Sequence, residues 1–284
     1  MSNKMTRNSI RLIKGGIVAA LLTLLAMLHS TTFAHNQNGQ VFHTTVSLRH
    51  SPHGTADLTW NPQNTKLTVT IKLSGLQAQT SHAAHIHSGD CSTDGTIVYP
   101  LNNVVADAAG NGTSTTTINN VTDGIPATGW HINVHSGPTL QTPAEALAIS
   151  CGEIVNQQAA TNTTQSVSVP LDGANADNQQ ATGTVDLSLD QGTLTVNTTV
   201  SNLVPGSEHA AHIHAGSCES QLPGNILYPL TTLKADTQGV ASSVTVIPNV
   251  SSIPASGWYV NIHFGTDLST QTGFDPIACG NVGH

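Results

Sequence analysis

Alternation between polar and apolar residues is the main pattern along this chain of 284 residues. Residues 66–73 alternate strictly, and residues 185–189 alternate in the same way before an Asp-Gln-Gly turn at 190–192. A period of two places successive side chains on opposite faces of a β-strand, and such a turn connects two strands in a hairpin. Only residues 143–149 show a weak helical period. We therefore expect an all-β protein whose short strands form a Greek-key barrel or sandwich.

A pattern of histidine, glycine and cysteine residues occurs twice along the chain. The matched positions lie 127 or 128 residues apart. This spacing indicates a duplicated unit, with one set of candidate functional residues in each copy. The matched segments are His-Ala-Ala-His-Ile-His at 82–87 and 209–214, Gly-Trp-His-Ile-Asn-Val-His at 129–135 with Gly-Trp-Tyr-Val-Asn-Ile-His at 257–263, and Cys-Gly at 151–152 and 279–280.

The duplication predicts two tandem domains of ordinary size, at residues 39–154 and 164–284. Residues 155–163 lack an apolar period and are rich in Gln, Asn, Ala and Thr, so we expect a linker there. Residues 1–34 combine a basic start, a short apolar run and a small residue, Ala34, at the end, which is typical of a secretory signal peptide. We therefore expect a secreted, extracytoplasmic protein that has no membrane anchor once the signal is cleaved.

Removal of the signal peptide leaves a strongly acidic chain. Four of the eight basic residues lie within residues 1–34 and none of the sixteen acidic residues does, so the remainder has a formal net charge of −12. A basic surface for nucleic acid or anionic lipid is therefore not expected.

The four cysteines fall into two matched pairs, one in each repeat. In an oxidising compartment an even, repeat-matched set of cysteines predicts disulfides, here Cys91–Cys151 and Cys218–Cys279. A cysteine metal site is the weaker alternative, because no two cysteines lie close together in the sequence.

Strand alternation gives the histidines of each repeat a common face. His85 and His87 would point to the same side of a strand, with their Cα atoms roughly 6.5–7 Å apart. If the strand that ends at His135 is a neighbour, its ring can complete a three-histidine site. Three neutral imidazoles with an open position suit copper or zinc. The candidate metal ligands are His85, His87 and His135 in the first repeat and His212, His214 and His263 in the second.

A structural role is the alternative for these histidines, which would then form hydrogen bonds at strand ends and bind no metal. The recurrence of the whole set, including the distant third histidine, favours metal binding. His82 and His209 lie three residues before each pair, so we expect them to support the ligands from outside the coordination sphere. Tyr259 replaces His131 in the second repeat, so His131 is not an obligate ligand.

At these residues the chain resembles the copper/zinc superoxide dismutase family. In that family a Leu-x-Pro-Gly segment leads into the metal-binding histidines, and a Gly and a Cys follow, as they do within residues 203–218 here. The last strand of the family carries a Cys-Gly that is similar to residues 151–152 and 279–280. The resemblance implies an eight-stranded Greek-key barrel in each repeat, with copper at both three-histidine sites and superoxide as a substrate.

Two features of that family are missing from this sequence. No histidine occurs between Cys91 and Trp130 or between Cys218 and Trp258, so the zinc ligands and the bridging histidine are absent and zinc is not expected. The segments at 143–150 and 274–278 contain no basic residue that could guide superoxide to copper. An acidic chain without a local cation loses electrostatic steering of an anion. The sequence therefore leaves catalytic turnover open, and no catalytic residue is assigned.

A second resemblance is to the CHRD domain, named from chordin. That domain pairs an Ala-His-Ile-His segment with a later strand of the pattern Trp/Tyr-x-Asn-x-His, similar to residues 84–87 and 258–263. CHRD domains usually end in a Gly-Glu-Ile-Arg-Gly run where this chain has Cys-Gly. The resemblance implies a β-sandwich-like module without enzymatic activity.

The leading hypothesis is a secreted, disulfide-bonded tandem of dismutase-like β domains that binds copper and supports redox or superoxide chemistry. An extracellular CHRD-like binding or structural module without catalysis is the main alternative. Copper storage or delivery is a third hypothesis, because it needs the metal ligands but no substrate channel.

Overall fold

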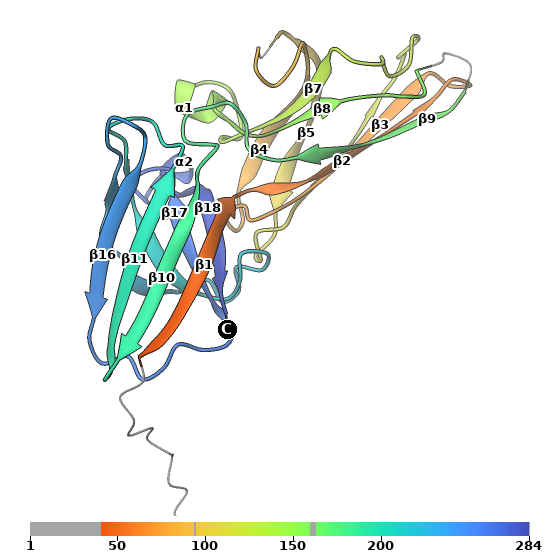
Figure 1. The fold of residues 1–284 in the computed structure, drawn as a ribbon. Coiled ribbons are helices and arrows are strands. Elements are labelled where there is room, and N and C mark those ends of the chain that lie inside the picture. The colour runs from red at the N-terminus through yellow and green to blue at the C-terminus, as the bar shows by residue number, and fades with distance from the viewer. Residues whose placement is uncertain (1–40, 94, 160–162, 284) are drawn as a thin grey trace, which may run out of the picture. The chain divides into compact units, whose positions relative to one another are not determined.

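A computed structural model describes residues 41–93, 95–159 and 163–283, which belong to one compact unit. The predicted signal peptide lies outside the described residues. The described chain is almost entirely β-structure, in two eight-stranded antiparallel sheets that curl into nearly closed barrels (Figure 1). This architecture confirms the predicted all-β class with two tandem β domains.

The first sheet has the strand order β8-β7-β4-β5-β6-β3-β2-β9. Its two end strands meet at a bridge between Cys151 and Asp172, which closes the barrel. The strands of this first barrel are β2 (His53–Asn61), β3 (Lys66–Ser74), β4 (Ser81–Ser88), β5 (Ile97–Ala106), β6 (Gly112–Ile118), β7 (Trp130–His135), β8 (Ala148–Ile154) and β9 (Gln165–Leu171).

The second sheet has the order β14-β13-β17-β18-β1-β10-β11-β16. Thr231 spans the gap between its end strands, since its N–H donates to Thr245 Oγ1 and its hydroxyl donates to the carbonyl of Val244. The strands of this second barrel are β1 (Phe42–His50), β10 (Thr182–Asp190), β11 (Thr193–Ser201), β13 (Ala211–Ala215), β14 (Ile226–Pro229), β16 (Ala241–Ile247), β17 (Trp258–His263) and β18 (Pro276–Val282). A small two-stranded sheet of β12 (Glu208–His209) and β15 (Leu233–Lys234) and two single-turn helices, α1 (Pro143–Ala146) and α2 (Gln271–Phe274), complete the described elements.

The first strand of each repeat lies in the barrel of the other repeat. Strand β1 pairs with β10 and β18 of the second barrel, and β9 pairs with β2 of the first (Figure 1). The pairing therefore crosses the predicted division at 39–154 and 164–284. The predicted boundaries come from the sequence repeats, and where each domain begins and ends stays a prediction.

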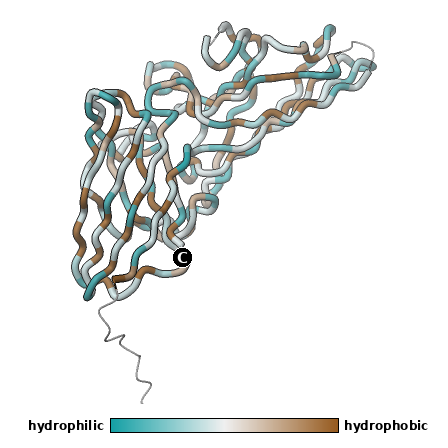
Figure 2. The backbone as a smooth tube through the Cα atoms, in the orientation of Figure 1, coloured by the Kyte–Doolittle hydropathy of each residue, from teal (hydrophilic) through white to brown (hydrophobic). Residues whose placement is uncertain are grey.

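Each exchanged strand buries its apolar face in the barrel that receives it. Val46 and Leu48 of β1 belong to the core of the second barrel, and Val169 and Leu171 of β9 belong to the core of the first. The polar residues between them face outward, and this alternation is visible along the tube in Figure 2. Complete burial of a Val or Leu side chain stabilises a fold by about 1.5–3 kcal/mol, so each exchange is held by apolar burial as well as by backbone pairing.

The local predictions agree with the described elements. Residues 66–73 lie in β3, and the hairpin from β10 to β11 turns at Gln191 and Gly192, which have φ angles of 46° and 81°. Two consecutive positive φ angles match the twist that flanking strands require, and glycine adopts the second without steric cost. The weak helical pattern at 143–149 forms one turn, α1, capped by the Thr142 hydroxyl.

Both predicted disulfides are confirmed. Cys91 is bonded to Cys151 and Cys218 to Cys279, with Cα–Cα distances of 6.0 and 5.9 Å. Each bridge ties the loop after the first histidine pair to the last strand of the same repeat. In the chain-entropy account, closing a loop of this length stabilises the fold by roughly 4 kcal/mol.

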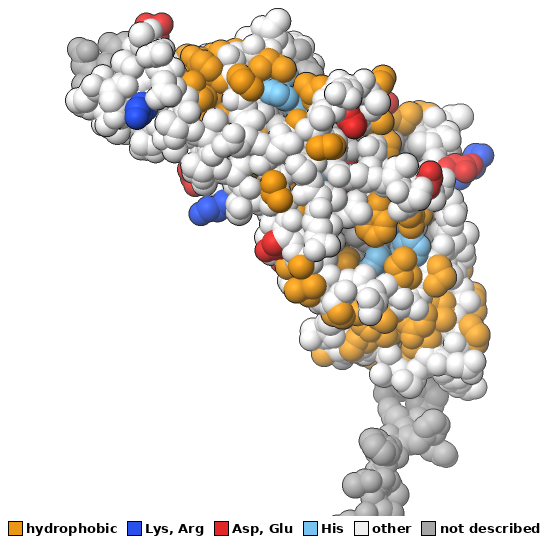
Figure 3. Space-filling model, turned by 180° about the vertical axis from the view of Figure 1, so that it is seen from behind, with side chains coloured by type: hydrophobic (Ala, Val, Ile, Leu, Met, Phe, Trp, Pro, Cys, Tyr) orange, Lys and Arg blue, Asp and Glu red, His pale blue; other side chains and the backbone are white. Residues whose placement is uncertain are grey.

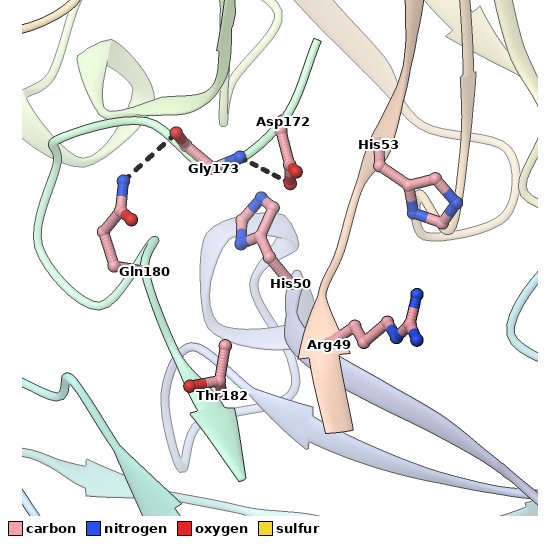
Figure 4. A pocket seen from close by; sticks show the side chains of 7 residues that line it. All are labelled: Arg49, His50, His53, Asp172, Gly173, Gln180 and Thr182. Carbon is pink, nitrogen blue, oxygen red and sulfur yellow. Dashed lines mark hydrogen bonds between the residues drawn. The ribbon is translucent and has the colours of Figure 1, made fainter. Parts of the chain in front are cut away.

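An open cavity of about 490 Å³ lies where the chain crosses from one barrel to the other. Figure 4 shows the His50 ring beside Asp172, with Arg49 and His53 flanking it along the chain. The His50 ring donates from Nε2 to the carbonyl oxygen of Ile149, 3.1 Å away. Gln180 closes the far side by donating to the carbonyl of Gly173.

Within the described residues, neither helix has the length and apolar character that crossing a membrane would require.

Replacement of Leu48 tests the strand exchange. We expect Leu48→Ala to lower the free energy of unfolding by about 2–4 kcal/mol, because it removes a buried side chain from the core of the second barrel. Hydrogen exchange should accelerate in β10 and β18, which pair with β1, and should stay unchanged in β2 and β3. Ser47→Ala, at the exposed neighbouring position, is the matched control. Acceleration confined to the first barrel would show that the pairing is wrong.

The burial of His50 predicts a pH-dependent contribution to stability. Burial lowers the pKa of His50 below 6.5, although the Asp172 carboxylate opposes the shift. The unfolded chain therefore binds more protons between the lowered folded pKa and 6.5, so the stability is fully present above pH 6.5 and is lost as the pH falls.

We expect His50→Gln, which keeps a donor for the Ile149 carbonyl, to flatten the dependence of unfolding free energy on pH. The slope between pH 5 and 6.5 should fall by at most about 1.4 kcal/mol per pH unit. Urea unfolding at several pH values measures this slope. Ser47→Ala, which alters an exposed side chain of β1 that does not titrate, should keep the wild-type slope. Identical slopes in the His50 variant and the wild type would refute the assignment.

Candidate metal centres

The antiparallel pairing of β4 with β7 brings together the three candidate ligands of the first repeat. His85 lies opposite Asn133, and His87 lies opposite His131, so the outward side chains of both strands share one face. His135 follows at the end of β7 on the same face. The intervening Ile86, like the other inward residues, is fully buried in the core.

The second repeat builds the same arrangement from β13 and β17. His212 lies opposite Asn261 and His214 lies opposite Tyr259, while His263 ends β17. In both repeats one ligand atom from each of the three histidines lies within 4.8 Å of the others. The ring centroids are 5.6, 5.2 and 5.8 Å apart in each group, so the two sites have the same geometry.

Backbone carbonyls fix the orientation of two rings in each site. In the second site the Nδ1 atoms of His214 and His263 donate to the carbonyls of Gly224 and Phe274, at 2.9 and 2.7 Å. These bonds assign the proton to Nδ1 and leave Nε2 as the nitrogen with a lone pair. Corresponding bonds in the first site join His87 to Gly95 and His135 to Ala146, both at 2.9 Å.

The nitrogens that face the centre of the second site are buried and lack protein partners. His212 Nδ1, His214 Nε2 and His263 Nε2 have no hydrogen-bond partner among the described residues. A buried polar atom without a partner costs about 1–3 kcal/mol, and three of them converge here. A metal ion bound by all three lone pairs would remove this cost.

Burial keeps the histidines of the second site neutral. It lowers the pKa of His212 to about 4 and that of His263 to about 3, and it also lowers the pKa of His214. Mutual repulsion between the rings adds to the effect at His212 and His263. All three are therefore unprotonated at neutral pH, as metal ligands must be.

His82 and His209 lie outside the ligand groups and support the third ligand of each site. His82 bonds through Nδ1 to the carbonyl of His135 at 2.9 Å, and His209 bonds to the carbonyl of His263 at 3.0 Å. The other nitrogen of each ring contacts a hydroxyl, Thr80 in the first repeat and Ser207 in the second. These contacts hold the backbone of the third ligand, and a role in metal affinity stays a prediction.

One position distinguishes the two sites. The His131 ring stacks on His87 with a centroid distance of 5.3 Å, and Tyr259 stacks on His214 at 5.0 Å. Neither His131 nor Tyr259 belongs to a ligand group. The replacement of the His131 imidazole by the Tyr259 phenol therefore changes a side chain that packs against the site, and it leaves the three histidine ligands unchanged.

The strand exchange also brings a basic residue toward the second site, which the local sequence does not show. Arg49 pairs with Cys279, which pairs with Asn261, which lies opposite His212. The row spans three strand spacings, so Arg49 lies roughly 14 Å from His212 along the sheet. Residues 274–278 contain no basic residue, as the sequence shows, but strand β1 places Arg49 opposite Cys279 in the second barrel.

The corresponding row of the first barrel ends on an acidic residue. Asp172 pairs with Cys151, which pairs with Asn133, which lies opposite His85. The residues at these two matched positions, Arg49 and Asp172, therefore carry opposite charges, and both also line the cavity between the barrels. Sequence reasoning missed this difference because both charges come from the exchanged segments.

A buried contact that the sequence did not indicate links the segments beside the two sites. The Ser136 hydroxyl, next to His135, donates to Asp275 Oδ2 at 2.6 Å, and Asp275 follows the Phe274 carbonyl that orients His263. Burial raises the pKa of Asp275 to about 8, although the bond from Ser136 opposes the shift. The counterparts of Ser136 and Asp275 in the other repeat are Phe264 and Leu147, so the duplication gave no sign of this contact.

On the face drawn in Figure 3, histidine side chains reach the surface among apolar side chains. In the first site His85 is partly exposed, whereas His87 and His135 are buried. In the second site all three histidines are buried. The candidate centres therefore lie just below the barrel surface.

Comparison with known protein families finds the CHRD domain twice, over residues 35–139 and 167–266. The matches include all six candidate ligands and end before the strands that carry Cys151 and Cys279. No curated protein matches the chain significantly. The dismutase resemblance stays a hypothesis.

The two matches cover most of the chain and coincide with the two sets of paired histidine strands. This protein therefore belongs to the CHRD domain family, with two copies of the domain in tandem.

Proposed function

We propose that this protein is an extracellular CHRD module that binds one copper ion at each three-histidine site. The observation that carries the proposal is the convergence of three buried imidazole nitrogens that have no partner in the second site. The family and the two disulfides support an extracellular location, because disulfides persist in oxidising compartments.

The donor set favours copper among the common metals. Three imidazoles suit Zn²⁺ and copper, and the affinity of a nitrogen site for divalent metals is highest for Cu²⁺. The four cysteines are held in disulfides and offer no thiolate to compete for the metal. Copper at such a site supplies a one-electron couple with a position left for solvent or another ligand.

The protein's own residues define the rest of the site. The carbonyls of Gly224 and Phe274 hold the rings of His214 and His263 in one tautomer, which pre-orients both Nε2 atoms. The strand register holds His212 against Asn261. A site arranged in this way before the metal arrives needs little reorganisation on binding.

Copper titration of the chain lacking residues 1–34 tests the proposal. We expect the wild type to bind two more copper ions than the double variant His135→Ala/His263→Ala, with a nitrogen-rich Cu(II) EPR signal. Each single variant should lose one ion, because each removes one ligand from one site. His43→Ala, an exposed histidine of β1, is the matched control. Equal copper uptake by the wild type and the double variant would refute the proposal.

A second candidate is the dismutation of superoxide at the second site, and the position of Arg49 favours it. Arg49 lies three strands from His212 on the same row of the sheet, and a cation there would attract a small anion. Asp172 occupies the matched position in the first barrel, so activity is expected at the second site alone.

Superoxide consumption by the copper-loaded protein tests this second candidate. We expect Arg49→Gln to lower the second-order rate constant by at most about twofold at low ionic strength, with no loss of bound copper, because one charge roughly 14 Å away contributes only about 0.3 kcal/mol in water. Lys72→Gln, which removes an exposed cation from β3, should leave the rate unchanged. A wild-type rate no higher than that of free copper would leave metal binding without turnover.

A further inference from the structure

A small cavity of about 200 Å³ lies beside the second three-histidine site. Its wall includes the ligand His214, the stacked Tyr259, and Asn261, which faces His212 across the strand pair. Gln221 closes it from the loop that follows the disulfide, and Gln77 and Ala108 close it from the first repeat. The cavity therefore joins the candidate metal centre to residues of both repeats.

Three amide side chains that line this cavity have an unsatisfied polar atom. Gln221 Nε2, Asn261 Oδ1 and Gln77 Oε1 are buried and have no hydrogen-bond partner among the described residues. Gln221 is 8% exposed and Asn261 is 1% exposed. Buried polar atoms in native proteins nearly always have partners, so these three atoms are available to hydrogen-bond to a small molecule that enters the cavity.

The loop that carries Gln221 is held in place and differs from its counterpart. The N–H of Gln221 donates to the carbonyl of Ala109 at 3.0 Å, and the Gly224 carbonyl binds His214 Nδ1. In the first repeat the carbonyl that binds the ligand ring comes eight residues after His87, whereas in the second it comes ten residues after His214. The two additional residues extend the loop of the second repeat where Gln221 lies.

The chemistry of the wall selects a neutral ligand. None of the described residues that line the cavity is an aspartate, glutamate, lysine or arginine. The unsatisfied atoms include both a donor and acceptors. A hydroxyl group both donates and accepts, so it can satisfy an amide in either orientation.

We propose that this cavity is a binding site for a small, neutral, hydroxyl-bearing molecule of the polyol class. The ligand would bond to Gln221, Asn261 and Gln77 and lie against Tyr259, beside the ligand His214 of the second site. The proposal rests on the proposed function and deepens it, because a polyol in this cavity would lie beside the copper ion proposed at the three histidines. The amides alone are enough to bind the polyol in metal-free protein.

Saturation-transfer NMR with glycerol on the metal-free protein tests the proposal. We expect saturable transfer to glycerol in the wild type. Transfer to lactate, which is similar in size but charged, should not saturate, because the wall offers no cation. Gln221→Leu should weaken glycerol binding about fivefold, the change expected for loss of one neutral hydrogen bond.

A second variant keeps the test independent of folding defects in the loop. Ala108 is exposed on the first repeat, so Ala108→Leu fills the cavity without altering a histidine or a buried amide. It should abolish glycerol binding, and Gln141→Leu, at an exposed position away from the cavity, should not. Absence of saturable transfer in the wild type, unchanged transfer in Ala108→Leu, or saturable transfer to lactate would overturn the proposal.

Copper loading separates this inference from the proposed function. In the copper-loaded His135→Ala variant, which keeps the second site alone, glycerol should shift the visible Cu(II) absorption. Copper binding without glycerol binding would refute the cavity proposal and leave the metal proposal intact. Glycerol binding to a protein that takes up no copper would refute the metal proposal and leave the cavity proposal intact.

Discussion

The register between the two histidine-bearing strands is the constraint on which both candidate centres depend. Because side chains alternate along a strand, a slip of one residue between β13 and β17 would turn the ligands toward the core and the core residues toward solvent. Fully buried Ile213, Val260 and Ile262 prevent that slip, since each would lose its apolar surroundings. The hydrophobic core therefore sets the position of the imidazoles, and carbonyls outside the strands set their rotation.

The exchange of first strands ties the two barrels into one compact unit and also makes their sites unequal. Each barrel takes core side chains and one charged residue from the other repeat, Arg49 in one case and Asp172 in the other. The loop with Gln221 and the stacked Tyr259 add to the difference. Two sites with the same three donors therefore lie in different electrostatic and steric surroundings.

Much of the fold and of the sites could be predicted from the sequence because the information is local. The alternation at 66–73, the turn at 190–192 and the spacing of His85 and His87 each describe one strand or one hairpin, and the repeat supplied the third histidine and the disulfide pairing. The strand exchange could not be predicted in this way. The alternation along β1 and β9 indicates which face of each strand is buried, but it does not record which sheet each strand joins.

The exchanged strands have a consequence for how such a protein can arise and be divided. A chain with a single repeat would have to fold its own first strand back or trade it with a second molecule, whereas in the tandem chain the trade occurs within one polypeptide at a high effective concentration. Cutting the chain near residues 155–163 would give two fragments that each carry a strand belonging to the other. Neither repeat alone contains all the strands of one barrel, so the pair of repeats is the smallest segment that keeps both barrels complete.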